Sequence, residues 1–163
     1  MAGAAYVIFD GDNDKWAYAY MNGWKANKNI DFDYQNAHDL DNMTGRAQDE
    51  QYVKSKLLER MKNSSAVVVL VGEKTKNLYK YVRWELELAL QLGLPIIVAN
   101  LNKTNRKDND RCPAIIREAC AIHIPYTLEA LKYAMAYWPA AFRGLSASDK
   151  AAGWRYYSSF DPK

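Results

Sequence analysis

The stretch AVVVLVGEKTKNLYKYVRWELELALQLGLPIIVANL, residues 66–101, decides the fold. It begins with a continuous apolar run, Ala66–Gly72, and ends with a second one that starts at Pro95. Strands that are covered on both faces of a parallel sheet have this composition. An amphipathic helix, ended by Gly93, lies between the two runs. We therefore interpret the stretch as a strand–helix–strand unit of a parallel sheet.

The same alternation continues through the rest of the chain. Five strands are predicted, at Tyr6–Asp10, 30–36, 66–72, 95–101 and 121–126. Helices are predicted between them, and a last one, Leu128–Trp138, ends before Pro139. This order favours one α/β domain over residues 1–145, with a five-stranded, mostly parallel, doubly wound sheet flanked by helices. Residues 146–163 form a C-terminal tail whose structure the pattern leaves open.

Composition limits the classes of function. The 163 residues carry a net charge of +3 and suit one domain with its own core. Lys and Arg form no concentrated stripe, and residues 10–50 are acidic, so we expect no nucleic acid partner. No apolar run has the length of a membrane span and no leader precedes the first strand, so we expect a cytoplasmic protein with no membrane association. Two cysteines and two histidines, widely spaced, predict no metal site.

Glu85 is the most informative single residue. On a helical wheel, Lys80, Arg83, Glu87 and Gln91 share a solvated face, and Glu85 falls within the opposite face with Leu78, Tyr81, Val82, Leu88, Ala89 and Leu92. A carboxylate in that position is either a structural acid or a functional one. A structural acid would pair with a base such as Arg46 or Arg60, or would be stabilised near the N-terminus of its helix by the helix dipole. A functional acid would line a cleft.

The predicted topology places the candidate site. In doubly wound sheets, ligands bind outside the carboxyl ends of the strands, where the strand order reverses. Three polar loops follow predicted strands: FDGDND (9–14), NAHDL (36–40) and VGEKTKN (71–77). We expect these loops and the first turns of the Glu85 helix to form one crevice, with Glu85 facing it.

The acidic loop FDGDND allows several interpretations. A calcium loop would need Gly at Lys15 and Glu at Met21, so that interpretation fails. A magnesium-dependent phosphatase that uses Asp10 and Asp12 remains an alternative. Capping of the following helix by Asn13 or Asp14 explains one of the acids but not all three. The sequence has no phosphate-binding glycine motif and no serine-hydrolase elbow.

Several short motifs together resemble a known family. They are YVIFDGDND, AHDL, YVRWELELAL, GLPIIVANLN, DRCP and AIHI, and the likeness covers roughly residues 5–138. In this combination the sequence resembles the TIR (Toll/interleukin-1 receptor) domains, and within them the bacterial TIR-like branch that includes the TIR proteins of the Thoeris anti-phage system (ThsB-like). The resemblance implies a flavodoxin-like/TIR-like fold.

The resemblance also implies an activity and its residues. Catalytic TIR domains cleave the nicotinamide–ribose bond of NAD with a Glu four residues after an aromatic residue, which corresponds to Glu85 after Tyr81. Tyr81 stands where many of these enzymes have Trp, and Trp84 is a second candidate to stack on the substrate. Other implied substrate-binding residues lie in the loops after the first and second strands: Phe9, Asp10, Gly11, Asp12, His38, Asp39 and Arg46.

The implied mechanism needs no cofactor, since NAD is the substrate and nicotinamide leaves as a neutral group. The resemblance implies a cyclic or conjugated ADP-ribose product that reaches a downstream effector protein as a diffusible nucleotide signal. It further implies a phage-derived trigger and assembly into a homo-oligomer. The alternative from another class is a non-enzymatic TIR-like interaction module, in which Glu85 is structural.

Overall fold

The computed structural model describes residues 4–26, 34–35, 50–78 and 81–160. In this part of the chain, six parallel strands form one sheet in the order β2-β1-β3-β4-β5-β6. The strands are β1 (Ala5–Ile8), β2 (Tyr34–Gln35), β3 (Ala66–Val71), β4 (Ile96–Asn100), β5 (Ala121–Pro125) and β6 (Arg155–Tyr156). The predicted doubly wound α/β fold is therefore confirmed. The strand order reverses between β1 and β3, which is where such sheets bind ligands.

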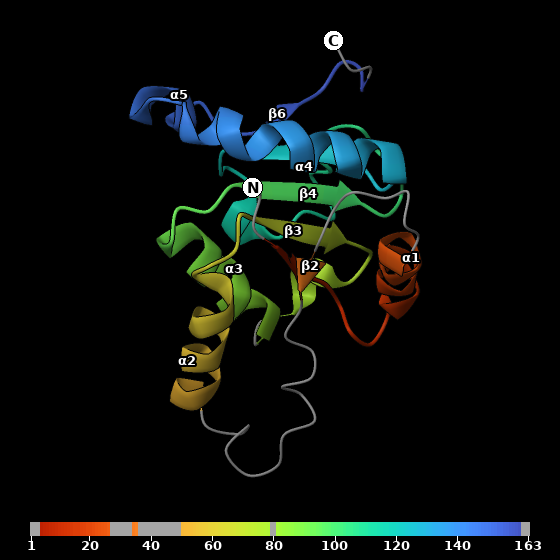
Figure 1. Ribbon diagram of the computed structural model, residues 1–163, viewed down its shortest axis with the longest axis vertical. Helices are drawn as coiled ribbons and strands as arrows, with labels where there is room; N and C mark the ends of the chain where they lie inside the picture. Colours follow the sequence, from red (N-terminus) through yellow and green to blue (C-terminus); the bar gives the residue numbers. More distant parts are fainter. Residues whose placement is uncertain (1–3, 27–33, 36–49, 79–80, 161–163) are drawn as a thin grey trace.

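Helices cover both faces of the sheet (Figure 1). Helices α2 (Glu50–Met61) and α3 (Tyr81–Gln91) pack side by side on one face. The other face is covered by α1 (Lys15–Ala26) and α4 (Leu128–Arg143). The short elements are α5 (Ala147–Ala151) and the 3-10 turns η3 (Thr75–Asn77) and η4 (Ala114–Ile116). No helix in the described residues is long and apolar enough to cross a membrane.

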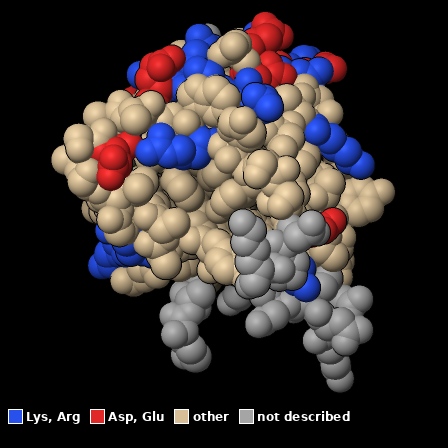
Figure 2. Space-filling model, turned by 90° about the horizontal axis from the view of Figure 1, so that it is seen from above, with Lys and Arg blue, Asp and Glu red and all other residues tan. Residues whose placement is uncertain are grey.

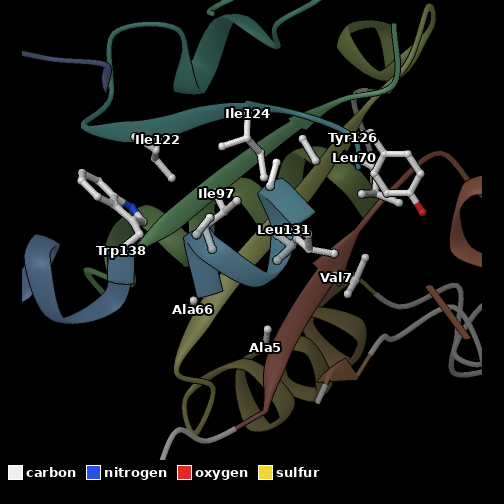
Figure 3. Packing of buried hydrophobic residues seen from close by; sticks show 14 of the residues in the cluster. Ala5, Val7, Ala66, Leu70, Ile97, Ile122, Ile124, Tyr126, Leu131 and Trp138 are labelled. Atoms are coloured by element: carbon white, nitrogen blue, oxygen red, sulfur yellow. The ribbon is translucent and has the colours of Figure 1, made fainter. Parts of the chain in front are cut away.

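The two faces of the sheet follow from the alternation of side chains along each strand. In β1, Ala5 and Val7 pack toward α1 and α4, whereas Tyr6 and Ile8 pack toward α2 and α3. Figure 3 shows the first of these layers, in which Leu131 of α4 lies over strand residues such as Ile97. Burial of a leucine or isoleucine side chain stabilises the fold by about 2 kcal/mol.

The buried face of α3 differs in part from the predicted one. Val82, Glu85, Leu86 and Ala89 are buried, at the i, i+3, i+4 and i+7 spacing of a helix that packs on one side. Leu86, which was not assigned to this face, is 1% exposed, and Leu92, which was, is 36% exposed because it lies beyond the helix end. The prediction that Glu85 lies on the buried face is confirmed.

Helix α4 corrects a second prediction. It continues through Pro139 to Arg143, although Pro139 was expected to lie beyond its end. Proline has no N–H and so removes one hydrogen bond from the helix. The extra turn buries Phe142, whose ring lies 5.8 Å from that of Trp138, and this burial offsets the lost bond.

The C-terminal tail, for which no structure was predicted, extends the sheet. Arg155 and Tyr156 pair with Ile122 and His123 of β5 as the short parallel strand β6. The guanidinium of Arg106 lies 4.2 Å from the centre of the Tyr156 ring, a cation–π contact that holds the added strand from the loop after β4.

The N-terminal cap of α4 provides a test of local stability. Thr127 is extended, and its side chain accepts a hydrogen bond of 3.1 Å from the backbone N–H of Ala130. We expect Thr127→Ala to lower the free energy of unfolding by about 1 kcal/mol. Ser146→Ala is the matched control, because the five-residue α5 that it caps buries no side chain. Urea unfolding of both variants measures the loss of free energy of unfolding. A larger loss for Ser146→Ala than for Thr127→Ala would contradict the role of Thr127 as the stabilising cap.

Candidate functional site

The carboxylate of Glu85 lies between α3 and the sheet. Its side chain is 4% exposed, and Oε2 accepts a hydrogen bond of 2.5 Å from the hydroxyl of Tyr6 in β1. This short hydrogen bond fixes the orientation of the carboxyl group. The apolar neighbours in this layer include Val82 and Leu86. A carboxylate with so little water around it interacts strongly with any charge that comes close.

Two aromatic side chains on the same helix accompany Glu85. The rings of Tyr81 and Trp84 meet at 5.4 Å in a T-shaped arrangement, and both are partly buried against the layer that contains Glu85. The ammonium group of Lys54 in α2 lies 5.1 Å from the centre of the Trp84 ring. On the solvated face of the helix, Arg83 Nε lies 3.0 Å from Glu87 Oε1.

The loop after β1 is held together by Asp10. This residue is 1% exposed, and its Oδ1 accepts hydrogen bonds from the backbone N–H groups of Asp12 at 2.9 Å and Asn13 at 3.2 Å. Its Oδ2 accepts one of 2.7 Å from the side-chain amide of Asn13. Asp10 therefore shapes its own turn, whereas Asp12 is exposed and Gly11 is partly buried.

Phe9 lies on the opposite face of the sheet from Glu85. Its ring stacks on that of Tyr18 in α1, with centroids 4.7 Å apart, and it belongs to the layer under α1 and α4. The structure thus brings Glu85, Tyr81 and Trp84 together and places Phe9 in a different layer. His38, Asp39 and Arg46 lie outside the described residues.

A pocket of about 380 Å³ opens at the carboxyl ends of β1, β3 and β4. It lies where the strand order reverses, as predicted for the crevice, but Glu85 is not among the described residues that line it. Residues from the loops after these strands and from α1 form its wall: Asn13, Asp14, Trp16, Gly72, Glu73, Lys74, Leu101, Asn102 and Arg111.

Asp14 is the acid of the FDGDND loop that turns toward this pocket. Its backbone carbonyl accepts from Ala17 N at the start of α1, while its side chain lies against Gly72. A Cβ atom at Gly72 would come within 2.3 Å of Asp14 Oδ2, so only glycine allows this approach. Burial raises the pKa of Asp14 from 3.8 to about 6, and the charge of Asp10 adds to the rise.

Two features, one beside Glu85 and one in the pocket, were not predicted from the sequence. The first is Tyr6, which was treated as an ordinary strand residue; a tyrosine that points into a core needs a partner for its hydroxyl, and this requirement was the available signal. The second is the position of Asp14 in the pocket wall, because the sequence had offered this residue only as a helix cap.

The buried histidine and the two cysteines are packed side chains. His123 is fully buried within β5. Cys112 and Cys120 are free thiols, and burial raises the pKa of Cys112 to about 11. Among the described residues, no three His, Cys, Asp or Glu side chains gather closely enough to hold a metal ion. On the face shown in Figure 2, charged groups of both signs are interspersed with uncharged surface.

Comparison with known proteins supports one family. No curated protein matches the sequence. The family model described as "Thoeris protein ThsB, TIR-like domain" matches residues 6–106, a range that runs from β1 through β4 and includes Glu85. That range is more than half of the 163 residues. The chain therefore belongs to the family of TIR-like domains of the Thoeris protein ThsB, and is a Thoeris-type protein of anti-phage defence.

Proposed function

We propose that the chain cleaves the nicotinamide–ribose bond of NAD and that Glu85 is the catalytic carboxylate. One observation carries the proposal: in a ThsB-type TIR-like domain, the acid on α3 is 4% exposed and held by the Tyr6 hydroxyl at 2.5 Å. The packing of the apolar layer and this hydrogen bond fix the position of the carboxylate before any substrate arrives.

The chemistry requires one well-placed negative charge. When the bond between the ribose anomeric carbon and the pyridinium nitrogen breaks, its electron pair leaves with nitrogen and nicotinamide departs neutral. No general acid is needed, unlike in glycosidases that use two carboxylates. Positive charge develops on the ribose, and a carboxylate nearby stabilises it by several kcal/mol in a water-poor site. Tyr81 and Trp84 are the candidates to stack on the pyridine or purine ring.

An acceptor then captures the ribosyl cation. A hydroxyl or amine forms the new bond to the anomeric carbon and gives up one proton, so the product is a cyclic or conjugated ADP-ribose. We propose that this product is the signal that activates a downstream effector after a phage-derived trigger. The polar stretch of sequence with His38, Asp39 and Arg46, which lies outside the described residues, belongs to this proposal as the substrate-access and assembly segment.

The reaction assay uses the protein recovered from infected cells and NAD as substrate. We expect nicotinamide to appear at the rate at which NAD disappears, with and without a chelator of divalent metals. Release of inorganic phosphate that needs magnesium, without nicotinamide, would favour the phosphatase alternative instead. The engagement of Asp10 by its own loop already gives that residue a structural role.

Tyr6→Phe tests how Glu85 is positioned. The substitution removes only the hydroxyl that donates to Oε2. We expect the kcat for nicotinamide release to fall about tenfold while KM stays within about twofold, because the bond orients a group that acts in the transition state. Tyr126→Phe is a matched control, since that hydroxyl donates to the carbonyl of Ala17 on the other face of the sheet. Equal losses in both variants would show a general effect on folding.

A further inference from the structure

The pocket at the carboxyl edge of the sheet contains groups that the Glu85 chemistry does not use. Its volume of about 380 Å³ lies in the range of small-molecule sites, and its place at the reversal of strand order is where doubly wound folds bind ligands. Glu85 bonds to Tyr6 in the layer under α2 and α3 and does not line this pocket. Within the part of the chain that the structure describes, the two places are therefore separate.

Asp14 is the first sign of a ligand. It is 6% exposed, and among the described residues its Oδ2 has no hydrogen-bond partner. Burial raises the pKa of the carboxyl group, and the charge of Arg111 and a side-chain hydrogen bond with Thr75 partly offset that rise. Buried carboxyl oxygens in folded proteins nearly always have a donor, since leaving one without a donor is costly. The missing side chain of Gly72 is what makes room for this carboxyl group beside the pocket. A ligand N–H group is the natural partner for it.

Trp16 supplies a surface for a planar ring. It lines the pocket and is 48% exposed. Its indole is held by near-perpendicular contacts with Tyr20 at 6.1 Å and Tyr126 at 6.2 Å. An indole held in this way, and exposed at the mouth of a pocket, is suited to stack on a nucleobase.

Two cations complete the pocket. Lys74 is exposed and follows β3, and Arg111 lies on the long segment between β4 and β5. The ion pair from Arg111 to Glu73 Oε1 is 3.5 Å long, and the Glu73 side chain is 76% exposed, so solvent screens the pair and an anion can compete for the guanidinium. Arginine and lysine at one mouth of a pocket are suited to a phosphate group.

We propose that this pocket is a second nucleotide site and that it binds a mononucleotide. The base stacks on Trp16 and donates an N–H to Asp14, and the phosphate binds Arg111 and Lys74. One exposed ring and one pair of cations match one base and one phosphate. The proposal goes beyond NAD cleavage and does not depend on it, since no bond of the ligand is broken here.

Titration calorimetry of the purified chain with adenosine and guanosine monophosphates tests the proposal. We expect at least one of them to bind, adenosine and inorganic phosphate to bind at least tenfold more weakly, and Asp14→Asn and Arg111→Gln each to weaken binding at least tenfold. Arg83→Gln is the matched control, because Arg83 pairs with Glu87 on α3 outside this pocket and its loss should leave binding unchanged. Trp16→Leu, at an exposed position, gives a third variant that does not disturb the core.

The remaining outcomes decide against the proposal. Absence of binding for both nucleotides, or binding that survives Asp14→Asn, Arg111→Gln and Trp16→Leu together, would overturn it. Glu85→Gln must bind the mononucleotide like the wild type; if it does not, the pocket is not a separate site. A chain that binds the mononucleotide but releases no nicotinamide would support this inference and contradict the proposed NAD cleavage, so the two can fail independently.

Discussion

Replacement of Glu85 by Gln is expected to slow nicotinamide release from NAD by at least about 100-fold. The amide keeps the shape of the side chain and can still accept a hydrogen bond from Tyr6, but it removes the charge. Loss of a group that stabilises transition-state charge in a desolvated site typically costs a factor of 10² to 10³ in kcat. The measurement is steady-state release of nicotinamide by wild type and variant, with unfolding curves for both.

Glu87→Gln is the control for this variant. It stands two residues away on the same helix, on the exposed face where it pairs with Arg83, so we expect nearly full activity. Surface pairs of this kind contribute little to stability, about 0.3–0.5 kcal/mol. Equal activity in wild type, Glu85→Gln and Glu87→Gln would make Glu85 a structural acid. The chain would then act as a TIR-like interaction module.

The second large effect is a dependence of stability on pH that comes from His123. Its side chain is fully buried, and neither ring nitrogen has a hydrogen-bond partner among the described residues. Burial lowers its pKa from 6.5 to about 4, and the charge of Lys107 acts in the same direction. At pH values between about 4 and 6.5, His123 therefore binds more protons in the unfolded chain than in the folded one. The free energy of unfolding contributed by His123 therefore falls as the pH drops through this window.

His123→Leu removes this contribution. From the two pKa values, we expect the variant to gain about 2 kcal/mol relative to wild type when the pH is lowered from 7 to 4.5. Denaturant unfolding at both values measures it. Ile122→Val, the neighbour in β5, should change stability equally at both pH values because it does not titrate. A His123→Leu effect that is the same at pH 7 and pH 4.5 would contradict the buried, neutral imidazole.

Asp14 acts in the opposite direction over much of the same window. Its pKa is raised, so the folded chain binds the extra proton, and its contribution to stability decreases as the pH rises from about 4 to about 6. The two groups therefore partly cancel in the wild type. Comparison of His123→Leu and of Asp14→Asn with the wild type, at both pH values, separates the contributions of the two groups.

Much of the fold was predictable because it depends on local patterns. Two continuous apolar runs identified β3 and β4, and the wheel placed Glu85 on the buried side of α3. Where prediction failed, a tertiary contact outweighed a local signal. Pro139 is a helix breaker by itself, but burial of Phe142 carries α4 past it. The short strand β6 forms only because the edge of β5 is there to pair with it.

The candidate site was less predictable for the same reason. The partner of Glu85 is Tyr6, 79 residues earlier in the chain, and no local pattern connects them. We expected Glu85 to face the crevice after β1 and β3, because the first turns of its helix α3 were assumed to lie at the same edge of the sheet. The structure places the carboxylate deeper, against β1, and gives the edge pocket to Asp14 and Trp16.

Nicotinamide in lysates of phage-infected cells is the most direct test of the central claim. Cells that carry wild type, Glu85→Gln or Glu87→Gln, all of confirmed fold, would be sampled through infection and analysed for nicotinamide and ADP-ribose products. We expect both to rise in wild type and Glu87→Gln and to stay at the uninfected level in Glu85→Gln, together with loss of defence. Defence that persists in Glu85→Gln with no nicotinamide release in any of the three strains would contradict the enzyme account.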